Sequence, residues 1–186
     1  MVSLRHHLHG RLFNPDLYNN IVVDEENQIL TVYLHNLSGQ IVGYQKYNPN
    51  SEDKTGKDPK NTRYFTYRTP GQNAVWGLEF LDSDRPELFI VEGIFKASVL
   101  HLLGFNAIAI LTSSPSPSLL NWIYTLPYQA IAIGDADKAG ENLVRKIGQG
   151  ATSPKDLDLM GPEEIVNFAI KQFLKAGRSN ASKHLI

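Results

Sequence analysis

Four apolar residues followed by a glutamate and a glycine, Leu88-Phe89-Ile90-Val91-Glu92-Gly93, open the most regular part of the sequence. A short apolar run of this kind is typical of a strand that is buried on both faces of a parallel sheet. The helical spacing of apolar residues over 95–103, which ends at Gly104, predicts a helix after this strand. The same order repeats twice downstream, with predicted strands at 107–111 and 129–133 and predicted helices at 116–126 and 139–147. This alternation predicts an α/β fold with a parallel sheet.

Two further signals complete this half of the chain. The segment 150–153 leaves room for only one short strand before the acidic residues that follow it. Pro162 and the two glutamates after it favour the first turn of a helix, because proline fits the first helical position and carboxylates interact well with the positive end of the helix dipole. We expect this last helix to run to about residue 176.

The first part of the chain has the pattern of antiparallel strands. Apolar and polar residues alternate over 29–35, and shorter apolar runs lie at 21–23 and 41–44. A further strand is expected at 63–67, after a polar segment, 48–61, that we interpret as a mobile surface loop. The sequence therefore predicts a small mixed α/β lobe with antiparallel strands and a basic loop over 1–86, and a parallel-sheet domain with a C-terminal helix over 87–186.

The composition is that of an ordinary globular protein and excludes several classes. The 186 residues include 18 Lys and Arg against 19 Asp and Glu, so the formal net charge is -1 and neither a polycationic nucleic-acid coat nor an acidic tail protein fits. Cysteine is absent, which excludes disulfides, cysteine-ligated zinc and iron–sulfur clusters. The N-terminus has no apolar signal-peptide region, and no run approaches the roughly 18 apolar residues of a membrane span. We therefore expect a cytoplasmic protein with no membrane partner.

Carboxylates follow the predicted strands at the points where the strands end, or precede the last helix: Glu92, Asp135, Asp137, Asp156 and Asp158. Because the carboxyl ends of parallel strands meet at one edge of the sheet, these side chains are expected to form an oxygen-rich pocket. Mg²⁺ and Mn²⁺ prefer oxygen ligands, and the chemistry that such ions serve is phosphoryl transfer. Each carboxylate taken singly is also compatible with a helix cap.

The order of these motifs, Val91-Glu92-Gly93 and then Gly134-Asp135-Ala136-Asp137-Lys138-Ala139-Gly140, resembles the Toprim domain. Toprim is the metal-binding module, with a Rossmann-like parallel sheet, of bacterial-type (DnaG-like) primases, type IA and II topoisomerases and certain nucleases. The resemblance implies that Glu92 acts as an acid/base or metal-site residue and that Asp135 and Asp137 bind Mg²⁺ or Mn²⁺, so these three are the catalytic candidates. Asp156 and Asp158 resemble the later acidic motif of primases, which adds them to the implied metal ligands.

The resemblance extends upstream of the Toprim motifs. The segments 37–46, 62–65 and 75–78 are similar to the small lobe that precedes Toprim in primases, and phage primase–helicases have a comparable Gln-Lys pair in this lobe. The chain departs from the pattern in two places. Primases often carry an acidic residue three positions after the glycine of Glu-Gly, where this chain has Lys96. The interval between Asp137 and Asp156 is short for a primase.

Basic residues and aromatic rings are interleaved in the small lobe, around the aromatic segment 64–67. Lysine and arginine pair with phosphates while rings stack on bases, so this composition suits single-stranded nucleic acid. A solvated loop beside core aromatics is the alternative. The cations that we predict to bind nucleic acid or NTP, including one in the Toprim motif itself, are Lys46, Lys60, Arg63, Arg68 and Lys138. Three histidines near the N-terminus are interpreted as a flexible and incidental cluster rather than a metal site: His6, His7 and His9.

The resemblance as a whole implies a primase-like enzyme, a nucleotidyltransferase with DNA-directed RNA polymerase activity. Such an enzyme joins NTPs into short RNA primers on single-stranded DNA in DNA replication, with Mg²⁺ or Mn²⁺ as cofactor. The implied partners are the template, NTPs and a replicative helicase on another chain. The reduced length is typical of a phage or mobile-element product in a bacterial cell. Two alternatives stay open, which are a Toprim metal-dependent nuclease and a non-catalytic nucleic-acid-binding accessory of replication.

Overall fold

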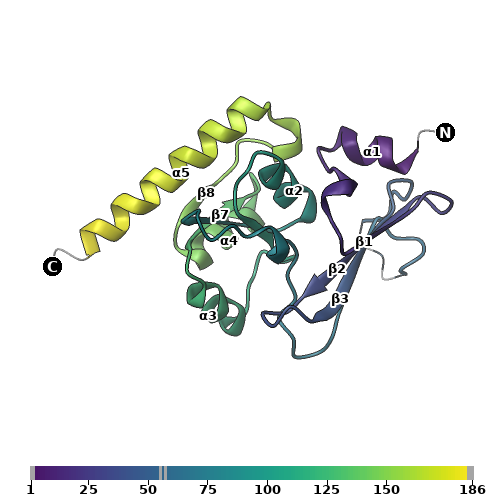
Figure 1. The fold of residues 1–186 in the computed structure, drawn as a ribbon, viewed down its shortest axis with the longest axis horizontal. Helices are drawn as coiled ribbons and strands as arrows, with labels where there is room; N and C mark the ends of the chain where they lie inside the picture. The colour runs from purple at the N-terminus through teal and green to yellow at the C-terminus, as the bar shows by residue number, and fades with distance from the viewer. Residues whose placement is uncertain (1–2, 55, 57, 184–186) are drawn as a thin grey trace. The chain divides into compact units, whose positions relative to one another are not determined.

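The structure is a computed structural model that describes residues 3–54, 56 and 58–183, with side chains described as far as Gly177. The chain forms two compact units, Met1–Trp76 and Gly77–Ile186, and each has its own sheet (Figure 1). The first sheet is antiparallel and the second is parallel. The fold class predicted from the sequence is therefore confirmed.

The first unit is a four-stranded sheet in the order β1-β2-β3-β4 with one short helix. Its elements in chain order are α1 (Leu4–Gly10), the 3₁₀ turn η1 (Pro15–Leu17), β1 (Ile21–Asp24), β2 (Ile29–His35), β3 (Ile41–Tyr47) and β4 (Tyr64–Arg68). All four predicted strands are present. The turn between β2 and β3 contains Gly39 with a φ of 74°, a left-handed conformation that glycine adopts without steric cost.

The register of this sheet separates a buried face from an exposed one. Gln45 is opposite Val32 on one side and Thr66 on the other, and residues directly opposite each other point to the same face. This buried face packs against α1 and the segments that flank the strands. The unit's core consists of apolar side chains that are fully or almost fully buried: Leu4, Leu8, Phe13, Leu30, Val32, Leu34, Val75 and Trp76. Removal of this apolar surface from water is the main term that stabilises the unit.

The N-terminal histidines belong to α1, which is anchored by the buried side chains of Leu4 and Leu8. The His7 ring stacks on Tyr47 with the ring centroids 5.8 Å apart, and its Nε2 lies 2.8 Å from the Tyr47 hydroxyl. Burial lowers the pKa of His7, and the charges of nearby arginines lower it further. The expectation of a flexible histidine cluster is therefore wrong for His7, because two leucines spaced by four residues anchor the helix that carries it.

The second unit is an α/β fold built on a four-stranded parallel sheet in the order β6-β5-β7-β8. Its elements in chain order are η2 (Leu78–Phe80), β5 (Glu87–Val91), α2 (Ile94–Leu102), β6 (Ala107–Ala109), α3 (Pro117–Thr125), β7 (Gln129–Gly134), α4 (Lys138–Ile147), β8 (Gly150–Thr152), η3 (Leu157–Leu159) and α5 (Pro162–Lys183). Every predicted strand and helix of this part is present. β5 is buried along its whole length, as expected for a central strand with helices on both sides of the sheet. In Figure 1, α5 lies above this sheet and α3 below it.

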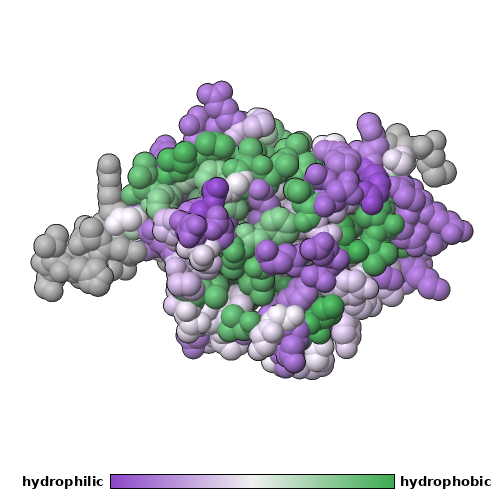
Figure 2. Space-filling view, viewed as in Figure 1, coloured by the Kyte–Doolittle hydropathy of each residue, from purple (hydrophilic) through white to green (hydrophobic). Residues whose placement is uncertain are grey.

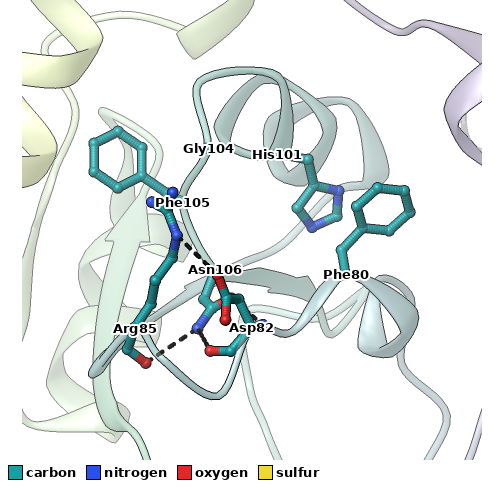
Figure 3. Close-up of a pocket in the computed structure, with 7 residues that line it drawn as sticks. All are labelled: Phe80, Asp82, Arg85, His101, Gly104, Phe105 and Asn106. Atoms are coloured by element: carbon teal, nitrogen blue, oxygen red, sulfur yellow. Dashed lines mark hydrogen bonds and ion pairs between the residues drawn. The ribbon is translucent and has the colours of Figure 1, made fainter.

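The segment 77–86 packs with the second unit, which therefore begins at Gly77 rather than after Pro86, where the sequence places the boundary. Asn106, only 1% exposed, holds this segment. Its side-chain nitrogen donates to the carbonyl oxygens of Asp82 at 2.9 Å and Arg85 at 3.3 Å, and its side-chain oxygen accepts from the backbone nitrogen of Asp82 at 2.8 Å (Figure 3). The turn residues at 82–86 mark a change of chain direction, but one buried amide joins them to the start of β6.

The last helix, α5, is longer than the sequence predicts. Gly177 favours a helix end, since an interior glycine costs about 1 kcal/mol relative to alanine, yet the helix continues through it to Lys183. Ile165 and Ala169 of this helix are buried, while Ile170 and Leu174 are exposed, and Figure 2 shows apolar side chains where Figure 1 places α5. No helix among residues 3–54, 56 and 58–183 is long and apolar enough to cross a membrane.

Candidate active site

The two central strands of the parallel sheet bring two acidic motifs together. β5 and β7 are neighbours, and Ile90 is level with Ala132, which brings Glu92 level with the end of β7. The chain leaves β5 toward β6 on one side and leaves β7 toward β8 on the other side. A reversal of this kind forms a crevice at the carboxyl ends of the two strands, where α/β proteins bind their ligands. Glu92 and Asp135 lie at this crevice.

Two glycines let β7 and α4 meet closely around Asp135. A Cβ atom on Gly134 would overlap the carbonyl group of Gly140, and a Cβ atom on Gly140 would overlap the backbone of Asp135. Close-packed interiors leave no room for such an atom without movement of the backbone. The spacing of the glycines in 134–140 therefore has a packing reason, because it holds the Asp135 backbone against the first turn of α4.

The environment of the Glu92 carboxyl group shows most directly what this site can bind. Burial raises its pKa, the negative charges of Asp135 and, more weakly, Asp137 raise it further, and the charge of Lys96 acts in the opposite direction. Its Oε1 atom is buried and has no hydrogen-bond partner among the residues that the structure describes. A buried polar atom without a partner costs free energy, and a native structure that keeps one usually uses it. Glu92 therefore presents an unused oxygen at the crevice.

Lys96 forms an ion pair with Asp135, its Nζ contacting the Oδ1 of Asp135. The two side chains are 15% and 28% exposed, so the pair is largely shielded from water. Lys96 departs from the primase pattern and is not among the site residues that the sequence predicts. Lys96 lies four residues after Glu92, in the first turn of the helix that follows β5. This position beside an acidic motif could have identified it as a site residue.

Asp137 caps α4. Its Oδ1 accepts a hydrogen bond from the backbone nitrogen of Gly140 at 2.8 Å, and its backbone is extended, as at most helix N-caps. The capping role that the sequence left open for each carboxylate is therefore present at this position. The hydrogen bond uses one of the two carboxylate oxygens, so it does not by itself exclude a second role.

The later acidic pair lies at η3, a 3₁₀ turn that packs against α2. Asp156 is exposed and directly precedes η3, and Asp158 lies within η3. The neighbouring Lys155 pairs with Glu164 in the first turn of α5, with Nζ and Oε2 3.1 Å apart. Within the described part of the chain, no group of three or more His, Asp or Glu side chains could hold a metal ion. The charges of Asp135 and Asp137 both act on Glu92, and a metal pocket that also includes Asp156 and Asp158 stays a prediction.

Fewer protein ligands can nevertheless hold Mg²⁺ or Mn²⁺. Mg²⁺ usually takes one or two carboxylates and completes its coordination with water and substrate phosphates. Glu92 and Asp135 supply two carboxylates at the crevice, and the Oε1 of Glu92 has no partner in the described structure. The residues present fit one divalent ion that substrate phosphates complete, and they do not fit an ion held by protein alone.

A hollow of about 520 Å³ opens on the exposed face of the first unit's sheet. Lys46 from β3 and Lys60 from the loop before β4 line it, together with Asn27, Asn48 and Asp24. Hydrogen bonds from Asn27 lower the pKa of Asp24, and the charge of Lys46 lowers it further. The two ammonium groups suit an anionic ligand such as a phosphate, and the Asp24 carboxylate, which accepts from the Asn27 amide at 2.8 Å, is the one negative charge among the lining residues named for this hollow.

Aromatic rings lie beside Lys46 on the same face of the sheet. The register puts Tyr44 opposite Tyr67 and Lys46 opposite Phe65. The Tyr44 ring centroid lies 5.6 Å from that of Tyr67 and 6.1 Å from that of Phe65, and the Lys46 Nζ lies 5.9 Å from the Tyr44 centroid. Tyr67 is 47% exposed. Exposed rings of this kind offer a stacking surface for unpaired bases.

The other predicted binding cations lie elsewhere. Arg68 is opposite Gly43, on the face of the sheet that also carries Gln45, and burial lowers its pKa. Arg63 donates from its Nε to the carbonyl oxygen of Ser51 at 2.5 Å, so it ties the loop before β4 to the strand. Lys138 is the exposed first residue of α4 in the second unit. The structure thus brings Lys46 and Lys60 to one hollow.

No family model matches the chain, and no curated protein matches it in sequence. Solved structures do match it. The DnaG primase catalytic domain bound to single-stranded DNA has a TM-score of 0.58 at 17% identity, covering 90% of this chain and 58% of that one. The fold is that of a DnaG-type primase catalytic core. The RNA polymerase domain of Mycobacterium tuberculosis primase DnaG is similar at a TM-score of 0.59 and 17% identity, covering 81% of this chain and 58% of that chain.

A phage structure shares the primase-like fold. It is a bacteriophage T7 lagging-strand DNA polymerase complex with the primase domains of two gp4 subunits bound to an RNA/DNA hybrid and dTTP. The match has a TM-score of 0.53 at 14% identity and covers 80% of this chain and 76% of that one. The chain spans about half the length of the bacterial primase structures that it matches. The primase-like fold expected from the sequence is confirmed, and the likeness lies in the fold.

Proposed function

We propose that the protein is a primase-like nucleotidyltransferase that makes short RNA primers on single-stranded DNA from NTPs in DNA replication, with Mg²⁺ or Mn²⁺ as cofactor. One observation carries the proposal. Glu92 keeps a buried oxygen without a partner at the crevice between β5 and β7, beside the charge of Asp135. The primase-like fold supports the class of reaction, and the carboxylates support its chemistry.

The carboxylates have distinct tasks in this reaction. The 3′-hydroxyl oxygen of the primer forms a bond to the α-phosphorus of an NTP, the bond between that phosphorus and the oxygen bridging to the β-phosphate breaks, pyrophosphate leaves, and the hydroxyl proton passes to water. Glu92 and Asp135 would hold a divalent ion, which supplies positive charge to the phosphates. The like charge of Asp135 helps to raise the pKa of Glu92, so a cation at the crevice relieves the repulsion between the two side chains. Asp137 keeps the first turn of α4 in place beside them.

Single-stranded DNA is proposed to bind the exposed face of the first unit's sheet. Lys46 and Lys60 would contact phosphates, while Tyr44 and Tyr67 would stack on bases. The double variant Lys46→Ala/Lys60→Ala should weaken binding and flatten the dependence of log K on log salt by about 1.4, because each lost phosphate contact with a single strand contributes about 0.7. Fluorescence anisotropy over a salt series measures this slope, and Lys171→Ala, an exposed lysine of α5, is the control. An unchanged slope in the double variant would contradict the assignment.

A primer-synthesis assay tests the function itself. The protein is incubated with single-stranded DNA, labelled NTPs and Mg²⁺ or Mn²⁺, and short NTP-dependent RNA products are expected. Glu92→Gln should reduce the rate by about a hundredfold or more, because a charge that holds the cation is lost. Glu141→Gln, which changes an exposed glutamate in the first turn of α4, should leave the rate unchanged.

The same assay separates the alternatives. Shortened DNA without RNA products would assign the site to a nuclease, since the same carboxylates serve hydrolysis of phosphodiesters. Binding of DNA with neither product would assign the protein to the non-catalytic accessories of replication. The Lys96–Asp135 ion pair is the observation that favours this last alternative, because an ammonium group already neutralises one of the carboxylates.

A further inference from the structure

We propose that Lys96 is the resident cation of the crevice, and that its ammonium group keeps free divalent ions from Asp135 in the resting protein. A divalent ion then binds together with a phosphate-bearing substrate, which gives Lys96 another anion to contact. This inference rests on the proposed function, since it concerns cation binding at the same carboxylates.

The ion pair places a positive charge on one of the two carboxylate oxygens of Asp135. The Nζ of Lys96 contacts the Oδ1 of Asp135, and the two side chains are only 15% and 28% exposed. Charges that are shielded from water interact more strongly than surface charges, and salt screens them less. A divalent ion at Asp135 must therefore either displace the ammonium group or sit beside it against electrostatic repulsion.

Lys96 also compensates charges that would otherwise repel. Glu92, Asp135 and Asp137 follow two adjacent strands, and the charges of both aspartates act on Glu92. Carboxylates that share a site destabilise one another when no cation is present. The ammonium group supplies that cation from within the chain, so the metal-free fold does not depend on a bound ion.

The same lysine is placed to receive a phosphate. It lies in the first turn of α2, a helix of nine residues that begins after Gly93 and has no acidic residue in its first turn. The positive end of the helix dipole and the ammonium charge therefore add at this point. Lysine has a flexible stem and three rotatable donors, so its contact can pass from a carboxylate to a phosphate with little movement of the backbone.

A Mn²⁺ titration without nucleotide tests the proposal. Free Mn²⁺ is followed by electron paramagnetic resonance, and thermal melts are recorded with and without the ion. Lys96→Met keeps the aliphatic stem and removes the charge, and it should bind Mn²⁺ about tenfold more tightly than the wild type, or more. Its melting temperature should fall without Mn²⁺ and recover with it, while the wild type should respond weakly. Lys146→Met, an exposed lysine at the end of α4, should behave as the wild type does.

Two more variants keep the result interpretable. Lys96→Arg retains the charge and should keep the weak Mn²⁺ binding of the wild type. Lys96→Met/Asp135→Asn removes both charges, and it should melt near the wild type without showing a Mn²⁺ response. Equal Mn²⁺ affinity in the wild type and Lys96→Met, or no response in either at millimolar Mn²⁺, would overturn the proposal. Primer synthesis by the wild type is measured separately, so the proposed function stands or falls on its own result.

Discussion

Asp135 illustrates how one neighbour changes the expected effect of a substitution. If Glu92, Asp135 and Asp137 were the only charges of the site, Asp135→Asn would remove one of three like charges and would stabilise the metal-free protein. The pair with Lys96 reverses this expectation, because the substitution leaves a largely shielded ammonium group without its counter-charge. We expect Asp135→Asn to lower the free energy of unfolding by about 1–3 kcal/mol without metal, as measured by urea denaturation. Unchanged or increased stability would contradict the importance of the ion pair.

Asp137 can be tested for capping and for function separately. Asp137→Ala removes the acceptor for the Gly140 backbone nitrogen and should lower the free energy of unfolding by about 1 kcal/mol. Asp137→Asn keeps an acceptor at the N-cap, so its unfolding free energy should stay within about 0.5 kcal/mol of the wild type. Chemical denaturation measures both values. Loss of primer synthesis in Asp137→Asn, at unchanged stability, would assign the carboxylate charge a role beyond the cap.

His101 makes the stability of the second unit depend on pH. Burial lowers its pKa from 6.5 to about 4 and so holds the ring neutral in the folded protein, although the hydrogen bond from its Nε2 to the carbonyl oxygen of Ala107, at 2.8 Å, acts in the opposite direction. The unfolded chain binds a proton below pH 6.5, whereas the folded one does so only near pH 4. Stability from this group is therefore complete above pH 6.5 and is lost as the pH falls toward 4, by at most about 3 kcal/mol.

The comparison of wild type with His101→Gln isolates this effect. The glutamine amide can donate to the same carbonyl oxygen but does not titrate, so the variant should lose less stability between pH 6.5 and pH 4. Glu92 changes the stability in the opposite direction. Burial raises its pKa, so the fold disfavours the ionised carboxylate and the protein gains stability as the pH falls and the group takes up a proton. Glu92 is present in both proteins, so its contribution cancels. Parallel pH profiles for the two proteins would contradict the assignment to His101.

The turn from β7 into α4 depends on close contact between backbones. Gly134→Ala and Gly140→Ala each place a methyl group on backbone atoms of the other segment, and backbone cannot move aside as cheaply as a side-chain tip. We expect each change to lower the free energy of unfolding by about 1–3 kcal/mol or more. Gly161→Ala, where a Cβ atom meets nothing within 4 Å, should change it by less than about 1 kcal/mol. Similar values for all three variants would contradict the packing argument.

The helices at the two ends of the chain show where sequence patterns are weakest. α1 has only two buried leucines and was not predicted, because a helix of seven residues has little periodicity of its own. α5 was predicted too short, because Gly177 has a low intrinsic preference for helix interiors. Short elements and helix ends depend on tertiary contacts more than on local preference.

The two units can be followed separately by their tryptophans. Trp76 is fully buried in the first unit, and Trp122 is 6% exposed in the second. Units with separate hydrophobic cores can unfold as separate cooperative transitions. In a Trp76→Phe background, where fluorescence reports on Trp122, Gly134→Ala should shift the urea transition to lower concentration. In a Trp122→Phe background the same change should leave the Trp76 transition in place, and equal shifts would show that the units unfold together.

Local pattern alone indicated the two sheets, the order of their strands along the chain and the acidic motifs at strand ends. These predictions succeeded because each depends only on the pattern of apolar and polar residues within a short stretch of the chain: a continuous apolar run for a strand buried on two faces, alternation for a half-buried strand, and helical spacing for a helix. The alternation of strand and helix restricts the second unit to a parallel sheet. In such a sheet the carboxyl ends of all strands lie at the same edge. The basic and aromatic character of the first unit's sheet was visible for the same reason.

Tertiary structure alone decided which of these residues meet. Glu92 lies beside Asp135 because β5 pairs with β7 rather than only with the next strand, β6. Lys96 pairs with Asp135, 39 residues away, and Asn106 joins β6 to the loop at residues 82–85. Such contacts depend on strand order and on the free energy of burying particular charged and polar groups together, and neither quantity is encoded in the spacing of residues along the chain.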